Sequence, residues 1–215
     1  LDNVKGEKLF KLLGINSNFL FYLSYIFISL IIILTWLIFP NMVLLIFLIV
    51  ASFHFGKEDT VFKVKKGFIL NEILFFLKGS SVIISPLLFH RENTNEIFAT
   101  LNFYVFESSF FNNYLLVIFL LLSLLSSIYL STGKSIEFKN IMILDYFSII
   151  ILNLFLTPIL AFTIYFCFLH SVRHSISLIH EMDKSFKKGF KKFIIKALPL
   201  TLITGLIFLI SIYFL

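Results

Sequence analysis

The sequence predicts an all-α integral membrane protein, a multi-span helical bundle. Apolar residues make up 59% of the 215 residues, and the mean hydropathy of +1.00 lies in the range of membrane proteins. Lysine and arginine exceed aspartate and glutamate by 18 − 12 = 6. Because the lysines fall between apolar segments, where positive charge orients helices, nucleic acid is not an expected partner. The single cysteine allows no disulfide framework.

Seven apolar segments predict seven transmembrane helices in a single polytopic membrane domain covering residues 1–215. About 20 apolar residues cross the hydrocarbon core, and two of the segments are shorter than that. A short interfacial helix is expected between the third and fourth segments. The expected spans are residues 19–39, 42–55, 68–90, 114–131, 141–156, 159–180 and 194–215.

The distribution of lysines supports this number of spans. If seven helices alternate across the bilayer, one side receives residues 1–18, 56–67, 132–140 and 181–193, which carry fourteen lysines. On the other side the only basic residue is Arg91. The positive-inside rule then predicts cytoplasmic basic loops and a C-terminus outside.

Two histidines one helical turn apart, His170 and His174, lie within the sixth apolar segment. Their i, i+4 spacing places both rings on one helix face, where they can chelate one metal ion. An ionisable side chain inside a membrane is costly and indicates a functional site. The alternative is that both rings form hydrogen bonds with a neighbouring helix.

Depth in the membrane adds a third histidine. At 1.5 Å per residue, His54 lies about 20 Å from the outer surface, and His170 and His174 lie about 18 and 24 Å from it. These three can meet in one layer of the cytoplasmic half. His90 and His180 fall at opposite membrane surfaces and are not expected to be ligands.

Other polar residues are expected near the same layer. Arg173 needs a partner at this depth, and Glu72, Asp145 and Asp59 are the candidates. A carboxylate could also accept the free ring N–H of a metal-bound histidine. Asp59 is nevertheless expected to lie among lipid headgroups and lysines.

Aromatic side chains surround the predicted layer. An apolar, aromatic pocket at bilayer depth favours a lipophilic substrate and, with three imidazoles, oxygenation by iron. The alternatives are a hydrolytic zinc site and aromatic residues that only pack between helices. The aromatic residues concerned are Phe53, Phe55, Phe162, Tyr165, Phe166 and Phe168; Tyr165 and Phe166 are the candidate pocket residues.

Three sequence stretches carry a resemblance to a known family. They are SFHFGKED at residues 52–59, AFTIYFCFLHSVRHSISL at residues 161–178, and ISPLLFH at residues 84–90 followed by Ile97-Phe98. Over nearly its whole length the chain resembles the Brp/Blh family of microbial β-carotene 15,15′-dioxygenases.

The resemblance implies an Fe(2+)-dependent enzyme of a prokaryotic plasma membrane. It implies that β-carotene is cleaved with O2 at its central double bond to give two all-trans-retinal, which supply a retinal-binding rhodopsin. The family's metal ligands map onto His54, His170 and His174. A further ligand histidine is expected just upstream of Leu1, because the family places it shortly before a Leu-Asp pair such as Leu1-Asp2. Eight spans would then be expected in the full-length protein.

Rival interpretations come from other classes. A b-type haem protein would use His54 and one of the pair as axial ligands, leaving the other unexplained. A di-iron desaturase needs about eight histidines, and five are present. A rhodopsin is excluded because the last span has no lysine at its middle. A transporter is the non-enzymatic alternative.

Overall fold

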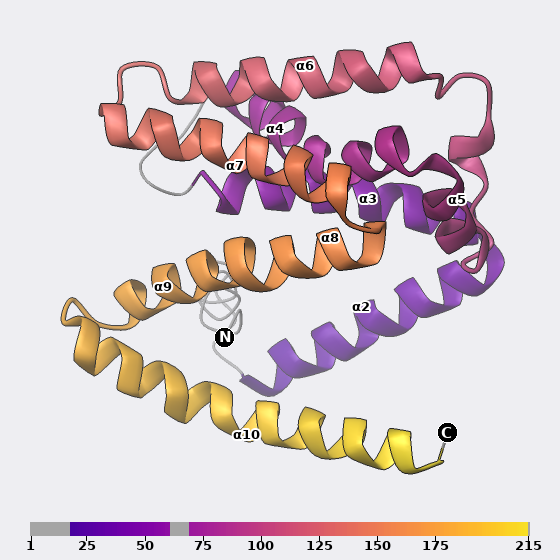
Figure 1. Cartoon of the computed structure of the whole chain (residues 1–215). Helices are drawn as coiled ribbons and strands as arrows, with labels where there is room; N and C mark the ends of the chain where they lie inside the picture. The colour runs from indigo at the N-terminus through magenta and orange to yellow at the C-terminus, as the bar shows by residue number, and fades with distance from the viewer. Residues whose placement is uncertain (1–17, 61–68, 215) are drawn as a thin grey trace. The chain divides into compact units, whose positions relative to one another are not determined.

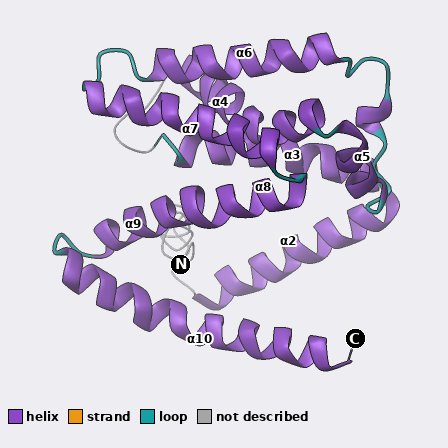
Figure 2. Ribbon diagram, viewed as in Figure 1, coloured by secondary structure: helices purple, strands orange, loops and turns teal. Residues whose placement is uncertain are grey.

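The computed structural model describes residues 18–60 and 69–214, and within them the chain is helical with no strand (Figures 1 and 2). The chain divides into two compact units, one of Ile31–Ser171 and one of Leu1–Leu30 with Val172–Leu215. The helices are α2 (Asn18–Ile38), α3 (Pro40–Glu58), α4 (Ile69–Phe89), α5 (Arg91–Ala99), the 3-10 helix η1 (Val105–Glu107), α6 (Asn113–Leu130), α7 (Ile136–Phe155), α8 (Pro158–Ile164), the π-helical η2 (Tyr165–His170), α9 (Ser171–Met182) and α10 (Phe186–Phe214).

The predicted all-α, multi-span architecture is confirmed. Six helical stretches among the described residues are long and apolar enough to cross a membrane, and α2 adds a shorter apolar helix, Tyr22–Ile38. Helices extend beyond the apolar segments. The last one begins at Phe186, inside the stretch 181–193 that was expected to be a loop. Lysine is a good helix former, so the basic stretch continues the helix out of the apolar region.

Local signals explain where several helices begin. Proline stands at the first turn of α3 and of α8, where its missing N–H costs nothing. Asn112 caps α6 by accepting a hydrogen bond from the Leu115 N–H at 3.0 Å. Ser135 caps α7 in the same way, from the Phe138 N–H at 3.4 Å. These caps satisfy amides that a helix start leaves without partners.

Within the unit Ile31–Ser171, α4 is the central helix. It packs against α3, α5, α6 and α7, and α7 also contacts α8 (Figure 1). Small buried residues allow this close packing, as is typical of membrane helices. Across the α4–α6 contact, the Ser123 hydroxyl donates to the Lys78 carbonyl oxygen at 2.8 Å. The small residues are Gly79, Ser80, Ser81 and Ser85 on α4 and Ser123, Ser126 and Ser127 on α6.

Two glycines bring the backbones of α3 and α4 into contact. A Cβ atom at Gly56 would collide with the carbonyl oxygen of Phe75, and one at Gly79 would collide with that of Ser52. Only glycine fits at both positions. The contact fixes the C-terminal end of α3 beside the middle of α4.

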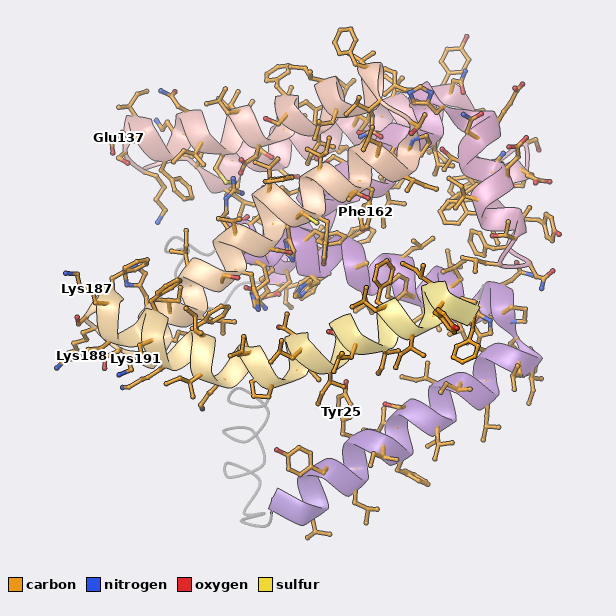
Figure 3. The ribbon with its side chains drawn as sticks, turned by 60° about the horizontal axis from the view of Figure 1, so that its bottom comes forward. Tyr25, Glu137, Phe162, Lys187, Lys188 and Lys191 are labelled. Carbon is orange, nitrogen blue, oxygen red and sulfur yellow. The ribbon has the colours of Figure 1, made fainter. Side chains whose placement is uncertain are left out.

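The other unit contains α9 and α10, joined by a short connection. Gly189 of α10 lies close to the Ile179 carbonyl, and the Lys192 ammonium donates to Asp183 Oδ2 at 2.7 Å. This hydrogen bond lowers the pKa of the half-buried Asp183 carboxyl. Figure 3 shows three further lysines gathered at the start of α10: Lys187, Lys188 and Lys191.

We expect Gly56→Ala to destabilise the protein, because the added methyl group meets backbone rather than a movable side chain. Overpacking of this kind costs about 1–3 kcal/mol. Circular dichroism during thermal unfolding in detergent measures the loss. Gly205→Ala is the matched control: a Cβ there meets nothing within 4 Å among the described residues, so its unfolding temperature should stay or rise. Equal effects of the two variants would contradict the close contact between the backbones of α3 and α4.

Candidate functional site

His170 is buried at the end of the π-helical segment η2. Its side chain is 4% exposed. The Phe166 ring stacks on it at 5.6 Å between centroids, and the Phe55 ring meets it edge-on at 4.9 Å. The sequence predicts one continuous α-helix over residues 159–180, whereas the structure interrupts it at Tyr165–His170. π-Helical turns are rare and frequent at functional sites.

His54 reaches the same place from α3. Its ring lies 5.4 Å from the His170 ring, centroid to centroid, at an interplanar angle of 65°. The His54 side chain is exposed, whereas that of His170 is buried. The structure therefore brings together two of the three predicted histidines, from segments more than a hundred residues apart in the sequence.

Asp59 holds His170 in place, and the expectation that it lies among headgroups is wrong. Its side chain is 8% exposed, because Asp59 ends α3 just after the close contact between α3 and α4. Oδ1 lies 3.0 Å from His170 Nδ1, and Oδ2 accepts the Tyr165 hydroxyl hydrogen at 2.6 Å. The stretch Gly56-Lys57-Glu58-Asp59 gave no signal that Asp59, and not its neighbour Glu58, would be buried.

The carboxyl of Asp59 is held in its charged form. Burial raises its pKa, but the hydrogen bond with His170, the positive charge of Lys78 and the hydrogen bond from Tyr165 together lower the pKa below its ordinary value. A carboxylate offers only acceptors, so Nδ1 of His170 carries the hydrogen in this contact. Nε2 is then the ring nitrogen left with a lone pair when the imidazole is neutral.

Lys78 is a second buried charge, and the sequence analysis did not identify it. It is 6% exposed, and its Nζ donates to Thr60 Oγ1 at 2.9 Å. The Thr60 hydroxyl in turn donates to the Gly56 carbonyl oxygen. Thr60 therefore links Lys78 to the end of α3, next to Asp59. A lysine beside a Gly-Ser-Ser run inside an apolar segment is the signal that could have found it.

The other predicted pocket residues divide into two groups. Tyr165 and Phe166 contact Asp59 and His170, as described above. Asp145 is buried and lines a cavity of about 10 Å³ together with Asp59, Lys78 and Tyr165. Glu72 instead forms an ion pair with Lys57 at 3.2 Å, with both side chains 47% exposed.

Arg173 and His174 belong to α9, in the second unit. Both side chains are half-buried. Within residues 18–60 and 69–214, no group of three or more histidine, cysteine or carboxylate side chains is arranged to hold a metal ion. The predicted ligand upstream of Leu1 lies outside the described residues.

An apolar cavity of about 280 Å³ adjoins the histidine and carboxylate cluster. Phe55 and Tyr165, which contact His170, form part of its wall. Residues of α3, α4, α5, α7 and α8 enclose it, including Phe162 of α8, labelled in Figure 3. The lining residues are Phe47, Leu48, Ala51, Phe55, Val82, Ile83, Pro86, Thr94, Ile97, Phe98, Ile149, Asn153, Pro158, Ile159, Ala161, Phe162 and Tyr165.

Fold and site together define a helical membrane protein with a histidine–carboxylate cluster beside an apolar cavity. The chain belongs to the β-carotene 15,15′-dioxygenase family, whose family model matches residues 1–215. This match confirms the resemblance seen in the sequence and indicates a carotene dioxygenase. No curated protein and no solved structure matches the chain significantly.

We expect the charges of Lys78 and Asp59 to be coupled. Lys78→Met removes a positive charge near the buried Asp59 carboxylate, and Asp59→Asn removes a negative charge near the buried Lys78 ammonium. The double variant should therefore lose less unfolding free energy than the two single variants lose together. We expect the difference to be about 0.5–3 kcal/mol.

Unfolding of the four proteins in detergent measures this coupling. Lys57→Met, which removes an exposed lysine of α3, is the control, with an expected effect within about 0.5 kcal/mol. Strict additivity of Lys78→Met and Asp59→Asn would show that the two charges act independently.

Proposed function

We propose that this protein is an iron-dependent oxygenase that cleaves β-carotene at its central double bond with O2, giving two all-trans-retinal. The observation that supports this most directly is the cluster of His54, His170 and Asp59 beside an apolar cavity. Membership of the β-carotene 15,15′-dioxygenase family supplies the reaction class.

The chemistry of the donor set fits iron. Neutral imidazoles are ligands that Fe(II) accepts, and a ligating histidine commonly gives its second N–H to a carboxylate. Asp59 occupies that position for His170, leaving Nε2 for the metal. We propose His54, His170 and His174 as metal ligands. When bound, iron would supply the redox chemistry that makes O2 reactive toward a double bond.

The protein's own residues would bind and orient the substrate. A polyene has no charge and few polar atoms, so its recognition depends on shape and on apolar contact. Phe55, Phe162 and Tyr165 line the cavity with aromatic surface. Holding the central double bond near the histidines would account for much of the catalysis, because orientation alone lowers a barrier substantially.

The location follows from the same proposal. The apolar helices place the protein in a membrane, where β-carotene also dissolves. We propose the plasma membrane of a prokaryotic cell, with the basic loops cytoplasmic and the C-terminus outside. The retinal formed would supply a retinal-binding rhodopsin, and membrane lipid would surround the helices and deliver the carotene.

His170→Ala and His54→Ala should each abolish retinal formation, since each removes a proposed ligand. The assay is chromatography of carotenoids and retinal extracted from cells that make β-carotene and express the protein. The colour of these cells fades when the enzyme is active. His180→Ala removes an exposed histidine of α9 that contacts Phe186 and should remain active. Retained activity in His170→Ala would contradict the proposal. A Soret band in the purified protein would indicate a b-type haem protein instead.

Asp59→Asn should weaken iron binding without removing a ligand. Mutation of a carboxylate that orients a metal-bound histidine typically costs 10–100-fold in metal affinity or activity. Iron content after dialysis against a graded chelator measures the affinity. Glu58→Gln, one residue earlier, is the matched control and should bind iron as the wild type does. Equal iron binding by wild type and Asp59→Asn would contradict the assigned role of Asp59.

A further inference from the structure

The apolar cavity has a polar residue in its wall that the cleavage of a pure hydrocarbon does not use. Asn153 of α7 is 5% exposed and lines the cavity. Most of the other lining side chains are apolar. Burying an amide in such surroundings costs free energy unless its hydrogen bonds are made.

The structure gives the Asn153 amide one hydrogen bond among the described residues. Nδ2 donates to the Ile149 carbonyl oxygen at 2.8 Å. An amide carries two N–H donors and a carbonyl oxygen that can accept twice, so one donor and the acceptor remain. A hydrocarbon in the cavity leaves both unused, whereas a hydroxyl group can satisfy them.

Asn153 lies further along α7 than the part of the cavity wall next to the histidine cluster. Ile149 packs with Phe55 and Tyr165, the two residues next to His170. Asn153 follows Ile149 by one helical turn, about 6 Å further along α7 and toward its end at Phe155. A substrate whose reacting bond lies near His170 would extend past Ile149 along this wall toward Asn153.

A second polar residue faces the same cavity from α5. Thr94 is 4% exposed, and its hydroxyl lies 2.7 Å from the His90 carbonyl oxygen and 3.0 Å from that of Pro86. A hydroxyl has one hydrogen, so donation to the backbone leaves its oxygen able to accept. Thr94 and Asn153 thus supply hydrogen-bonding groups from two elements of the cavity wall.

The cavity volume fits one end of a carotenoid. About 280 Å³ is at the small end of ligand pockets, which span roughly 300–1,000 Å³. This is enough for a terminal ring rather than for a whole carotenoid.

We infer that the cavity binds the terminal ring of the substrate and that Asn153 recognises a hydroxyl group on that ring. The chain would therefore accept carotenoids with a hydroxylated β-ring as well as β-carotene. This inference rests on the proposed function, because it assumes that a carotenoid occupies the cavity. Asn153 acts here as a specificity residue, with no part in the cleavage step.

The test compares β-carotene with its ring-hydroxylated derivative as substrates of wild type, Asn153→Leu and Ile149→Val. The leucine side chain has the same branched shape and number of non-hydrogen atoms as that of asparagine but forms no hydrogen bond. In Asn153→Leu, kcat/KM for the hydroxylated substrate relative to β-carotene should fall roughly two- to tenfold, the worth of one hydrogen bond. Ile149→Val trims the same cavity wall and should leave that ratio unchanged.

A ratio that is unchanged in Asn153→Leu, or that falls equally in Ile149→Val, overturns the inference. Binding provides a second measurement that needs no catalysis. From cells containing both carotenoids, wild type should co-purify with more of the hydroxylated form than Asn153→Leu does, and equal proportions would also overturn the inference. Failure of wild type to cleave either carotenoid would overturn the proposed function instead, and the co-purified pigment would still decide the role of Asn153.

Discussion

The Asp59 carboxylate is the group on which the site depends. It receives hydrogen bonds from His170 and Tyr165, which both lie in η2, while Asp59 itself ends α3. Two segments that are distant in the sequence are thus tied together by one buried charge. Such a charge is stable only when it is well hydrogen-bonded, so any shift of α3 relative to η2 would leave it poorly satisfied. This makes the relative position of the two segments well defined.

The packing of α3 on α4 prepares the position of that charge. Because Gly56 and Gly79 let the backbones touch, Thr60 can reach Lys78, and the positive charge of Lys78 lies near Asp59. The polar cluster is therefore enclosed by helices whose other contacts are small or apolar residues. A low-dielectric surrounding strengthens each hydrogen bond inside it and raises the cost of losing one.

The architecture could be predicted from the sequence, because apolar length and the placement of lysines are local properties. The proximity of His54 and His170 also followed from counting residues along two helices. Asp59 and Lys78 could not be placed in this way. Their burial depends on how two helices pack, and Glu58 and Asp59 have the same charge in sequence although Asp59 alone joins the site. The predicted grouping of His174 with the other two histidines stays a prediction.

The π-helical segment carries a consequence for insertions and deletions. Each residue of an α-helix turns the chain by about 100°, so the register of η2 decides which side chains face Asp59. Tyr165 and His170 both bond to Asp59 while separated by five residues, which is one turn of the wider helix. Removing a single residue between them, such as the exposed Cys167, would let the segment relax to an ordinary α-helix. The two side chains would then be four residues apart, a spacing that also keeps both on one face of an α-helix and beside Asp59. The extra residue of the π-helical turn is thus one that the helix can lose without separating the two groups that bond to Asp59.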